Sequence, residues 1–187
     1  MESKLFTPVT FGPLTLRNRT IRSAAFESMC PGNAPSDMLL DYHRSVAAGG
    51  IGMTTVAYAA VTQSGLSFDR QLWMRPEIIP GLRRLTDAIH AEGAAAGIQL
   101  GHCGNMSHKS ICGCMPVGAS SGFNLYSPTF VRGLRADELP EMARAYGRSV
   151  NLAREAGFDS VEIHAGHGYL ISQFLSPSTN HRKDEFG

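Results

Sequence analysis

Two histidines and a tyrosine lie within six residues of one another near the C-terminal end of the chain: His164, His167 and Tyr169. Imidazole N–H groups can stabilise negative charge on an oxygen, and a phenol with a pKa near 10 keeps a proton that it can transfer at neutral pH. Gly166 and Gly168 alternate with these residues and permit a tight bend. The spacing therefore predicts an active-site loop on which the three side chains converge.

The segments on either side of this loop should position it. Residues 159–164 alternate so that His164 ends an extended strand on the same face as Glu162. Residues 169–175 have the apolar spacing of a short helix, which Pro177 closes. A lone histidine at a strand end is often only a hydrogen-bonded structural residue, but two histidines and a tyrosine across one glycine-rich turn favour a functional site.

The composition limits the class of protein. The chain has 187 residues and a formal net charge of +1, from 17 basic and 16 acidic residues, which gives no electrostatic basis for binding nucleic acid or a membrane surface. Four cysteines are too few for a secreted disulfide framework, and no apolar run approaches the roughly 20 residues of a membrane span. We therefore expect one cytoplasmic domain over residues 1–187.

The remainder of the chain alternates between expected strands and helices. A hairpin or cap over residues 5–18 precedes strands and helices in strict order: strands at 20–26, 51–61, 94–100 and 159–164, separated by helices that begin near 37, 76 and 137. The last helix should bury a stripe of Leu139, Met142, Tyr146, Val150 and Ala153. This alternation predicts an α/β fold with a parallel sheet and helices outside it.

Two parallel architectures remain, an open doubly wound sheet and a (β/α)8 TIM barrel. No Gly-x-Gly-x-x-Gly follows the first strand, where Ala24-Ala-Phe-Glu27 stands instead, and polar residues cluster just past the strand ends. Both features favour the barrel. A complete barrel takes about 250 residues, so this chain supplies roughly its first four βα units. Because such a unit leaves strand edges unpaired, we expect a homo-oligomer or pairing with the remainder of the barrel.

Six segments together resemble the Old Yellow Enzyme family of flavin mononucleotide (FMN) oxidoreductases: residues 5–8, 16–19, 49–52, 79–90, 99–102 and, most specifically, 158–187. The resemblance extends over the whole chain and corresponds to the N-terminal half of the family's barrel. Residues 22–27 are similar to the branch that includes 2,4-dienoyl-CoA reductases and bacterial enoate reductases. Proteins of that branch carry an iron–sulfur cluster on cysteines beyond the barrel, so a cluster is expected only in a longer parent chain.

The resemblance implies a role for each candidate site residue. Five residues would contact the flavin: Ala24, Ala25, Phe26, Tyr58 and Gln99. His164 and His167 match the pair that binds the substrate's carbonyl or carboxylate oxygen, and Tyr169 matches the proton donor. Many family members have a small polar residue near the position of Phe26, which cannot donate a hydrogen bond there.

The implied activity is that of an FMN-dependent ene-reductase. NAD(P)H would reduce the flavin, hydride would pass to the activated C=C bond of a small-molecule unsaturated carbonyl or carboxylate, and Tyr169 would supply the proton. The alternative is a truncated, non-catalytic barrel fragment that acts only by associating with another half.

The cysteines of the segment 101–135 do not predict a metal site. Cys103, Cys112 and Cys114 follow a Cys-x8-Cys-x-Cys spacing without a paired Cys-x2-Cys knuckle. A metal-dependent hydrolase that uses His164 and His167 is disfavoured, because no carboxylate follows them at ligand spacing. The segment is long for a connection inside a domain, and we expect it to cover a substrate.

Overall fold

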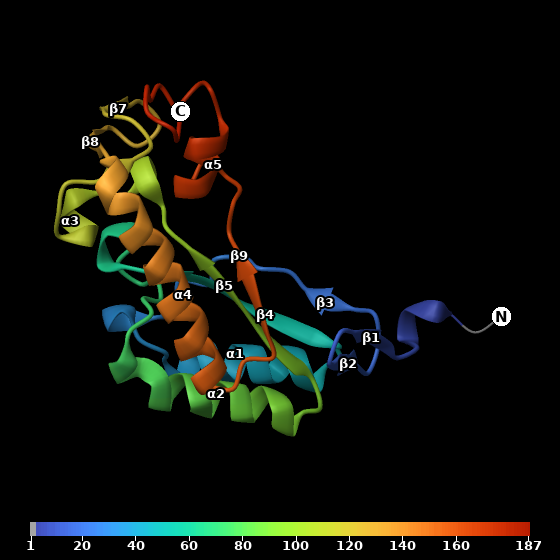
Figure 1. Cartoon of the computed structure of the whole chain (residues 1–187). Coiled ribbons are helices and arrows are strands. Elements are labelled where there is room, and N and C mark those ends of the chain that lie inside the picture. Colours follow the sequence, from blue (N-terminus) through green and yellow to red (C-terminus); the bar gives the residue numbers. More distant parts are fainter. Residues whose placement is uncertain (1–2) are drawn as a thin grey trace.

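The computed structural model describes residues 3–187. One parallel sheet has the strand order β3 (Ile21–Arg22), β4 (Met53–Ala60), β5 (Ala95–Gly101) and β9 (Ser160–Ile163). The strands are joined by helices α1 (Asp37–Ala48), α2 (Ile79–Ala91) and α4 (Leu139–Glu155), which lie on one side of the sheet (Figure 1). The predicted alternation of strands and helices is confirmed.

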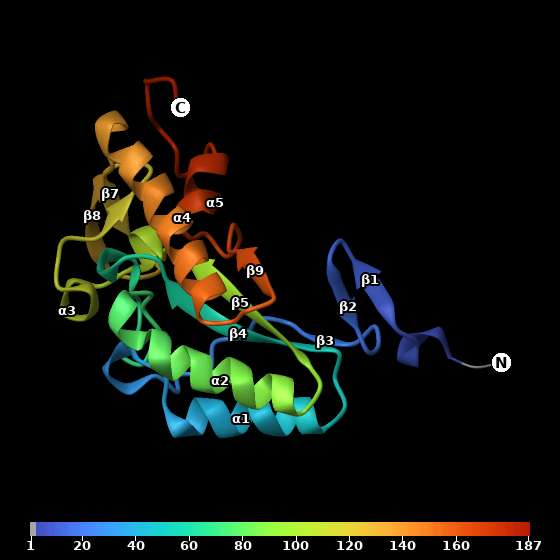
Figure 2. The same cartoon turned by 60° about the horizontal axis from the view of Figure 1, so that its bottom comes forward.

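The helices begin where the sequence places their capping residues. Ser36 Oγ accepts a hydrogen bond from Leu39 N (3.2 Å) at the start of α1. Short 3-10 turns, η4 (Pro76–Ile78) and η6 (Ala136–Glu138), lead into α2 and α4. Figure 2 shows α1 and α2 side by side beneath the sheet, with α4 next to them.

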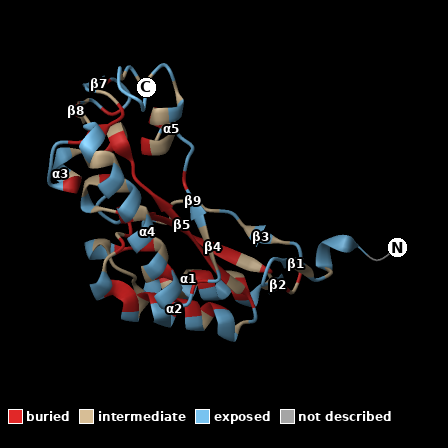
Figure 3. Cartoon of the chain, in the orientation of Figure 1, coloured by how far each residue is buried: buried red, intermediate tan, exposed pale blue. Residues whose placement is uncertain are grey.

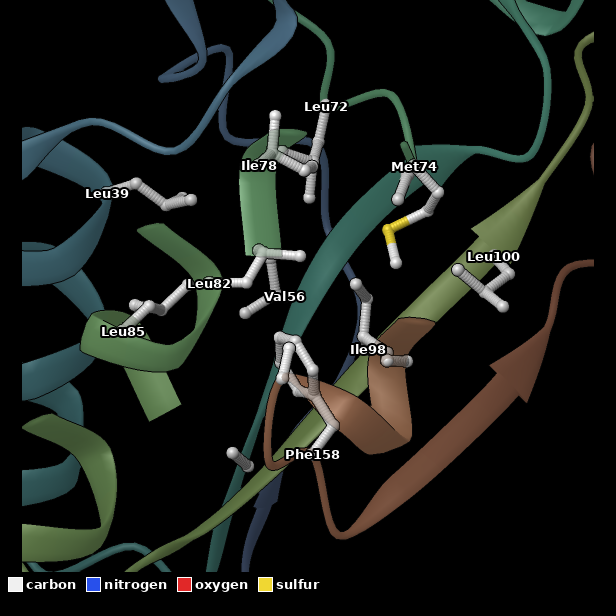
Figure 4. Close-up of a cluster of buried hydrophobic side chains, with 14 of the residues drawn as sticks. Leu39, Val56, Leu72, Met74, Ile78, Leu82, Leu85, Ile98, Leu100 and Phe158 are labelled. Atoms are coloured by element: carbon white, nitrogen blue, oxygen red, sulfur yellow. The ribbon is translucent and has the colours of Figure 1, made fainter. Parts of the chain in front are cut away.

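The main core lies between these helices and the sheet. It contains large side chains from both layers (Figure 4): Leu39, Val56, Leu82, Leu85, Ile98 and Leu100. Ile89 of α2 belongs to the same core. Strand β4 is buried over nearly its whole length, as predicted for a strand covered on both faces. Strand β9 is an edge strand whose residues are half-buried or exposed (Figure 3). Ile163 at its end is 45% exposed.

The buried stripe of α4 agrees with the prediction in part. The helix packs through small side chains, Ala145, Ser149 and Ala153, and only the last of these belongs to the predicted set. Met142 and Tyr146 are half-buried and line an apolar hollow of about 360 Å³. Met142, Tyr146 and Val150 still pack against the main core while remaining half-buried, so the predicted face is turned inward and its fully buried positions are small residues.

The N-terminal hairpin forms as predicted, from β1 (Val9–Phe11) and β2 (Leu14–Leu16). The long segment after β5 contains short helices η5 (Gly104–Met106) and α3 (Lys109–Cys112) and its own small sheet: β6 (Val117–Gly118), β7 (Gly122–Asn124) and β8 (Thr129–Gly133). Together with α5 (Leu170–Leu175), it stands at the end of the main sheet where β5 and β9 finish (Figure 1).

The other short elements are η1 (Lys4–Phe6), η2 (Pro31–Asn33) and η3 (Gln63–Gly65). Among residues 3–187, none of the helices combines the length and the apolar character needed to cross a membrane.

Candidate active site

The two histidines of the predicted loop contact each other. His164 is fixed at the end of β9, where its backbone N–H donates to the backbone oxygen of Leu100 (2.8 Å). Gly166 N donates to His164 Nδ1 (3.3 Å), so the imidazole proton lies on Nε2, which is 3.1 Å from His167 Nδ1. His167 has a left-handed backbone (φ 57°), which is uncommon outside glycine and turns its ring onto His164. The ring of His167 is therefore left with Nε2–H as the donor for a ligand.

The His164 ring is held neutral. Burial lowers its pKa below the ordinary 6.5, and the neighbouring His167 lowers it further, while Glu162 acts in the opposite direction. A neutral imidazole has one N–H donor and one acceptor nitrogen, which matches the hydrogen bonds observed.

Tyr169 ends a chain of hydrogen bonds that begins in the protein interior. Gln71 Nε2 donates to Cys103 Sγ (4.0 Å), and the Cys103 thiol donates to Tyr58 Oη (3.6 Å). Tyr58 Oη and Tyr169 Oη are 2.7 Å apart. Either oxygen can be the donor of this pair; we consider the arrangement in which Tyr58 accepts from Cys103 and donates to Tyr169 Oη. The Tyr169 proton is then free to be donated outward, toward the histidines or a ligand.

The three ionisable groups of this hydrogen-bond chain, Cys103, Tyr58 and Tyr169, retain their protons at neutral pH. Burial raises the pKa of Tyr58 far above the ordinary 10, and it raises the pKa of the Cys103 thiol to about 11. Burial also raises the pKa of Tyr169, whereas the hydrogen bond from Tyr58 lowers it. Tyr169 is thus a protonated phenol whose acidity is adjusted by a second phenol.

The loop after β5 holds Tyr169 in place through the residues that follow it. Leu170 N donates to His102 O (2.9 Å), directly beside Cys103. Gln173 is only 1% exposed, and its amide nitrogen donates to Asn105 Oδ1 (3.0 Å) and Gly168 O (2.7 Å). Helix α5 is therefore fixed to the segment that carries the thiol.

Most of the predicted flavin contacts come together around these tyrosines. Ala24, Phe26, Tyr58 and Tyr169 belong to one apolar cluster, together with Cys103 and its neighbours. The Phe26 ring also stacks on Phe68, with centroids 4.5 Å apart and an interplanar angle of 25°.

Ala25 and Gln99 lie outside this cluster. Ala25 is exposed, and its carbonyl accepts a hydrogen bond from Arg22 Nη2 (3.3 Å). Gln99 Nε2 donates to Glu162 Oε1 on the adjacent strand (2.6 Å). Within residues 3–187, Gln99 Oε1 makes no hydrogen bond, so this side chain offers an acceptor rather than both of the polar groups that the sequence suggested.

A buried carboxylate fixes the segment that carries Ala24 and Phe26. Glu27 accepts hydrogen bonds from Ala57 N (3.1 Å) and Arg22 Nη1 (2.9 Å), and His43 Nε2 lies 3.2 Å from it. The side chain of Glu27 is 3% exposed, so these partners offset the cost of burying its charge.

This donor set fits a planar ring with a polar edge. Phe26, Tyr58 and Ala24 provide an apolar and aromatic surface, and Gln99 on β5 offers Oε1 as an acceptor. No three histidine, cysteine, aspartate or glutamate side chains of the described residues gather as a metal site would require.

Sequence reasoning missed Cys103 and Gln71 as members of the site. Cys103 was considered only as a metal ligand, and Gln71 lies in a segment without a periodic pattern. The position of Cys103, two residues after the end of β5, was the available signal, because side chains past the ends of parallel barrel strands meet at one edge.

Comparison with known proteins agrees with this fold. The chain is 43% identical over 183 residues to the 4,4'-dithiodibutanoate disulfide reductase of Rhodococcus erythropolis, covering 98% of the chain and 45% of that protein. It is 36% identical over 192 residues to the NADPH dehydrogenase of Bacillus subtilis, covering 100% of the chain and 55% of that protein. The chain thus spans about half the length of these relatives.

The structure superposes on the old yellow enzyme homologue of Zymomonas mobilis with a TM-score of 0.91 and 30% identity. The superposition covers 99% of the present chain and 55% of the homologue. The four parallel strands and their helices are part of a (β/α)8 TIM barrel, as predicted. The model of the NADH:flavin oxidoreductase / NADH oxidase family matches residues 4–187. The chain therefore belongs to this family, the one that contains the Old Yellow Enzyme homologues.

Proposed function

We propose that this chain carries the catalytic half of an FMN-dependent oxidoreductase that reduces activated C=C bonds of unsaturated carbonyl or carboxylate compounds. The observation that supports this most directly is the Tyr58–Tyr169 hydrogen bond of 2.7 Å beside the two histidines. The ring centroids of His164 and Tyr169 are 4.9 Å apart, so a proton donor and an oxygen-binding pair face one small volume.

FMN, when bound and reduced by NAD(P)H, supplies the hydride that the C=C bond accepts. We assign the face of the ring system to Ala24, Phe26 and Tyr58, and the polar edge of the ring to Gln99 Oε1. Barrels usually bind phosphate in the loops after strands seven and eight. The four parallel strands of this chain do not include those loops, so we assign no residue to the FMN phosphate.

His164 and His167 bind the conjugated oxygen of the substrate on which negative charge develops. His167 Nε2–H can donate at once, whereas His164 Nε2–H must turn away from His167 Nδ1. Substrate oxygen therefore replaces the hydrogen bond between the two histidines. In comparable oxyanion sites, each donor of this kind stabilises the transition state by about 2.7–4 kcal/mol.

Tyr169 gives the proton to the α-carbon, which completes the reduction. We assign Tyr58 as the donor of the pair of hydroxyls, which leaves the Tyr169 proton directed toward the substrate. After transfer, the hydrogen bond from Tyr58 stabilises the phenolate of Tyr169, and the Cys103 thiol supports Tyr58 in turn.

A fluorescence titration of FMN into this chain, with sedimentation of the same sample, tests the proposal. We expect saturable quenching of the flavin fluorescence and weaker quenching for Gln99→Leu, which removes the acceptor at the ring edge. Gln63→Leu, in the separate turn η3, is the matched control. Absence of quenching from a folded, monodisperse sample would exclude a flavin site formed by this chain alone and favour a non-catalytic barrel fragment.

A further inference from the structure

A second reactive group lies at the end of helix α3, where the chain reads Cys112-Gly113-Cys114. The two sulfur atoms are 3.8 Å apart, with the Cys114 thiol donating to Cys112 Sγ. The Cys112 thiol donates to Cys114 O (3.2 Å). Gly113 has a left-handed backbone (φ 74°), and this turn brings the two side chains to the same side.

The two cysteines differ in access to solvent. Cys114 is exposed, whereas Cys112 is 2% exposed and packs beside Ala60 and Leu66. Cys114 also lines a cavity of about 580 Å³, between η3, β8 and the start of α4. This arrangement of one accessible thiol and one protected thiol is what a two-step exchange with a disulfide requires.

The walls of this cavity carry paired charges. Arg132 is 2.7 Å from Glu138, and Arg148 is 2.8 Å from Glu141. Because these charges neutralise one another, the cavity selects for no particular charge on a ligand. A small, uncharged disulfide matches both its volume and its lining.

We propose that Cys112 and Cys114 are a redox-active dithiol that reduces small-molecule disulfides. The Cys114 thiolate attacks one sulfur of the disulfide, the S–S bond breaks, and the first half leaves and takes up a proton. The Cys112 thiolate then attacks the Cys114 sulfur, forms the Cys112–Cys114 bond and releases the second half as a thiol. The cysteines lose two electrons and two protons, and the small disulfide gains both.

Peptide mapping tests this reaction on the whole chain. Trypsin cleaves after Lys109 and Arg132 and releases peptide 110–132, in which Cys112 and Cys114 are the only cysteines. The chain is incubated with 2-hydroxyethyl disulfide above neutral pH, because burial and Cys112 raise the pKa of the Cys114 thiol, although Arg132 opposes the shift. We expect this peptide to lose two hydrogens and to carry no adduct, with two equivalents of 2-mercaptoethanol released.

Two serine variants separate the two steps. Cys112→Ser should trap one mercaptoethanol group on Cys114, and Cys114→Ser should remain unmodified because Cys112 is buried. The buried Cys30 and Cys103 should stay reduced in every sample and serve as internal controls. A wild-type peptide that carries one or two adducts and no internal disulfide would overturn the proposal, whatever the behaviour of the variants.

Discussion

In the proposed function, Tyr169 donates a proton from the end of a hydrogen-bonded chain, and this role can be tested separately from flavin reduction. We expect Tyr169→Phe to slow substrate reduction by about 10²–10⁴-fold, because the phenol proton is lost while the ring remains. Reduction of bound flavin by NAD(P)H should proceed at an unchanged rate. Stopped-flow measurement of the two half-reactions, in the FMN-loaded assembly, checks this; equal loss in both would contradict the assignment.

Tyr58→Phe is the matched comparison for Tyr169→Phe. It removes the hydrogen bond to Tyr169 Oη but leaves the proton donor in place, and one hydrogen bond corresponds to about a two- to tenfold loss of rate. Because the bond from Tyr58 lowers the pKa of Tyr169, its removal should also shift the alkaline limb of the pH–rate profile upward. An unchanged profile would place Tyr58 outside proton transfer.

His164 and His167 should act on the oxygen of a bound ligand. We expect His164→Ala and His167→Ala each to weaken the binding of a phenol by about tenfold or more, because a charge-assisted hydrogen bond to the phenolate is lost. His167→Asn keeps an N–H donor and should retain most of the affinity. Titration of the charge-transfer absorbance of bound phenols measures this, and unchanged bands in both alanine variants would argue against the pair.

The loop after β5 contains a buried histidine that links folding to pH. His102 Nδ1 accepts from Gly104 N (2.9 Å), and Nε2 lies 3.1 Å from Ser64 Oγ. Burial lowers the pKa of His102 to about 4, against an ordinary value of 6.5. Protonation would put a hydrogen on Nδ1, where the backbone N–H of Gly104 already points, so the loop needs the neutral ring.

Because of His102, the fold should become less stable as the pH falls. Between 6.5 and about 4, the unfolded chain binds a proton at His102 that the folded chain does not, so the free energy of unfolding decreases with decreasing pH, by about 3 kcal/mol in total. Urea denaturation across this range should give a flatter profile for His102→Gln. His181→Gln, an exposed position, is the control, and parallel profiles for His102→Gln and wild type would refute the linkage.

At the scale of the molecule, apolar surface stands open between α4 and α5, beside edge strand β9. Two hollows of about 360 and 470 Å³ lie along α4 and α5, and the first also reaches Ile163 at the end of β9. Leu139, Ala143 and Phe174 line both hollows. Edge strand β9 lies beside them. An unpaired strand edge next to an apolar hollow favours association with another chain or with the remainder of a barrel.

We therefore expect this chain, studied alone, to form concentration-dependent oligomers. Ile163→Lys places a charge at the 45% exposed end of β9 and should increase the monomer fraction in sedimentation velocity. Leu125→Lys, at an 81% exposed position in the β7–β8 connection, adds the same charge elsewhere and should leave the distribution unchanged. If both variants shift the distribution equally, net charge and not the β9 edge controls association.

The sequence by itself determined the order of the strands and helices and the presence of the glycine-rich loop that carries His164, His167 and Tyr169. These features are encoded locally: the cap at Ser36, the apolar run of β4, and the alternation of His164, His167 and Tyr169 with glycines each act within a few residues. Local periodicity reports which residues can be buried, but it does not report which neighbour will bury them.

Only the tertiary structure decided which residues meet. Tyr58 and Tyr169 are 111 residues apart in the chain, and Cys103 joins them only because β4, β5 and β9 end at one edge of a parallel sheet. The same holds for α4, whose fully buried positions are the small residues Ala145, Ser149 and Ala153, while the longer apolar residues that pack against the core stay half-buried. Such pairings depend on the distance between packed layers, a property of the assembled fold that no local stretch of sequence contains.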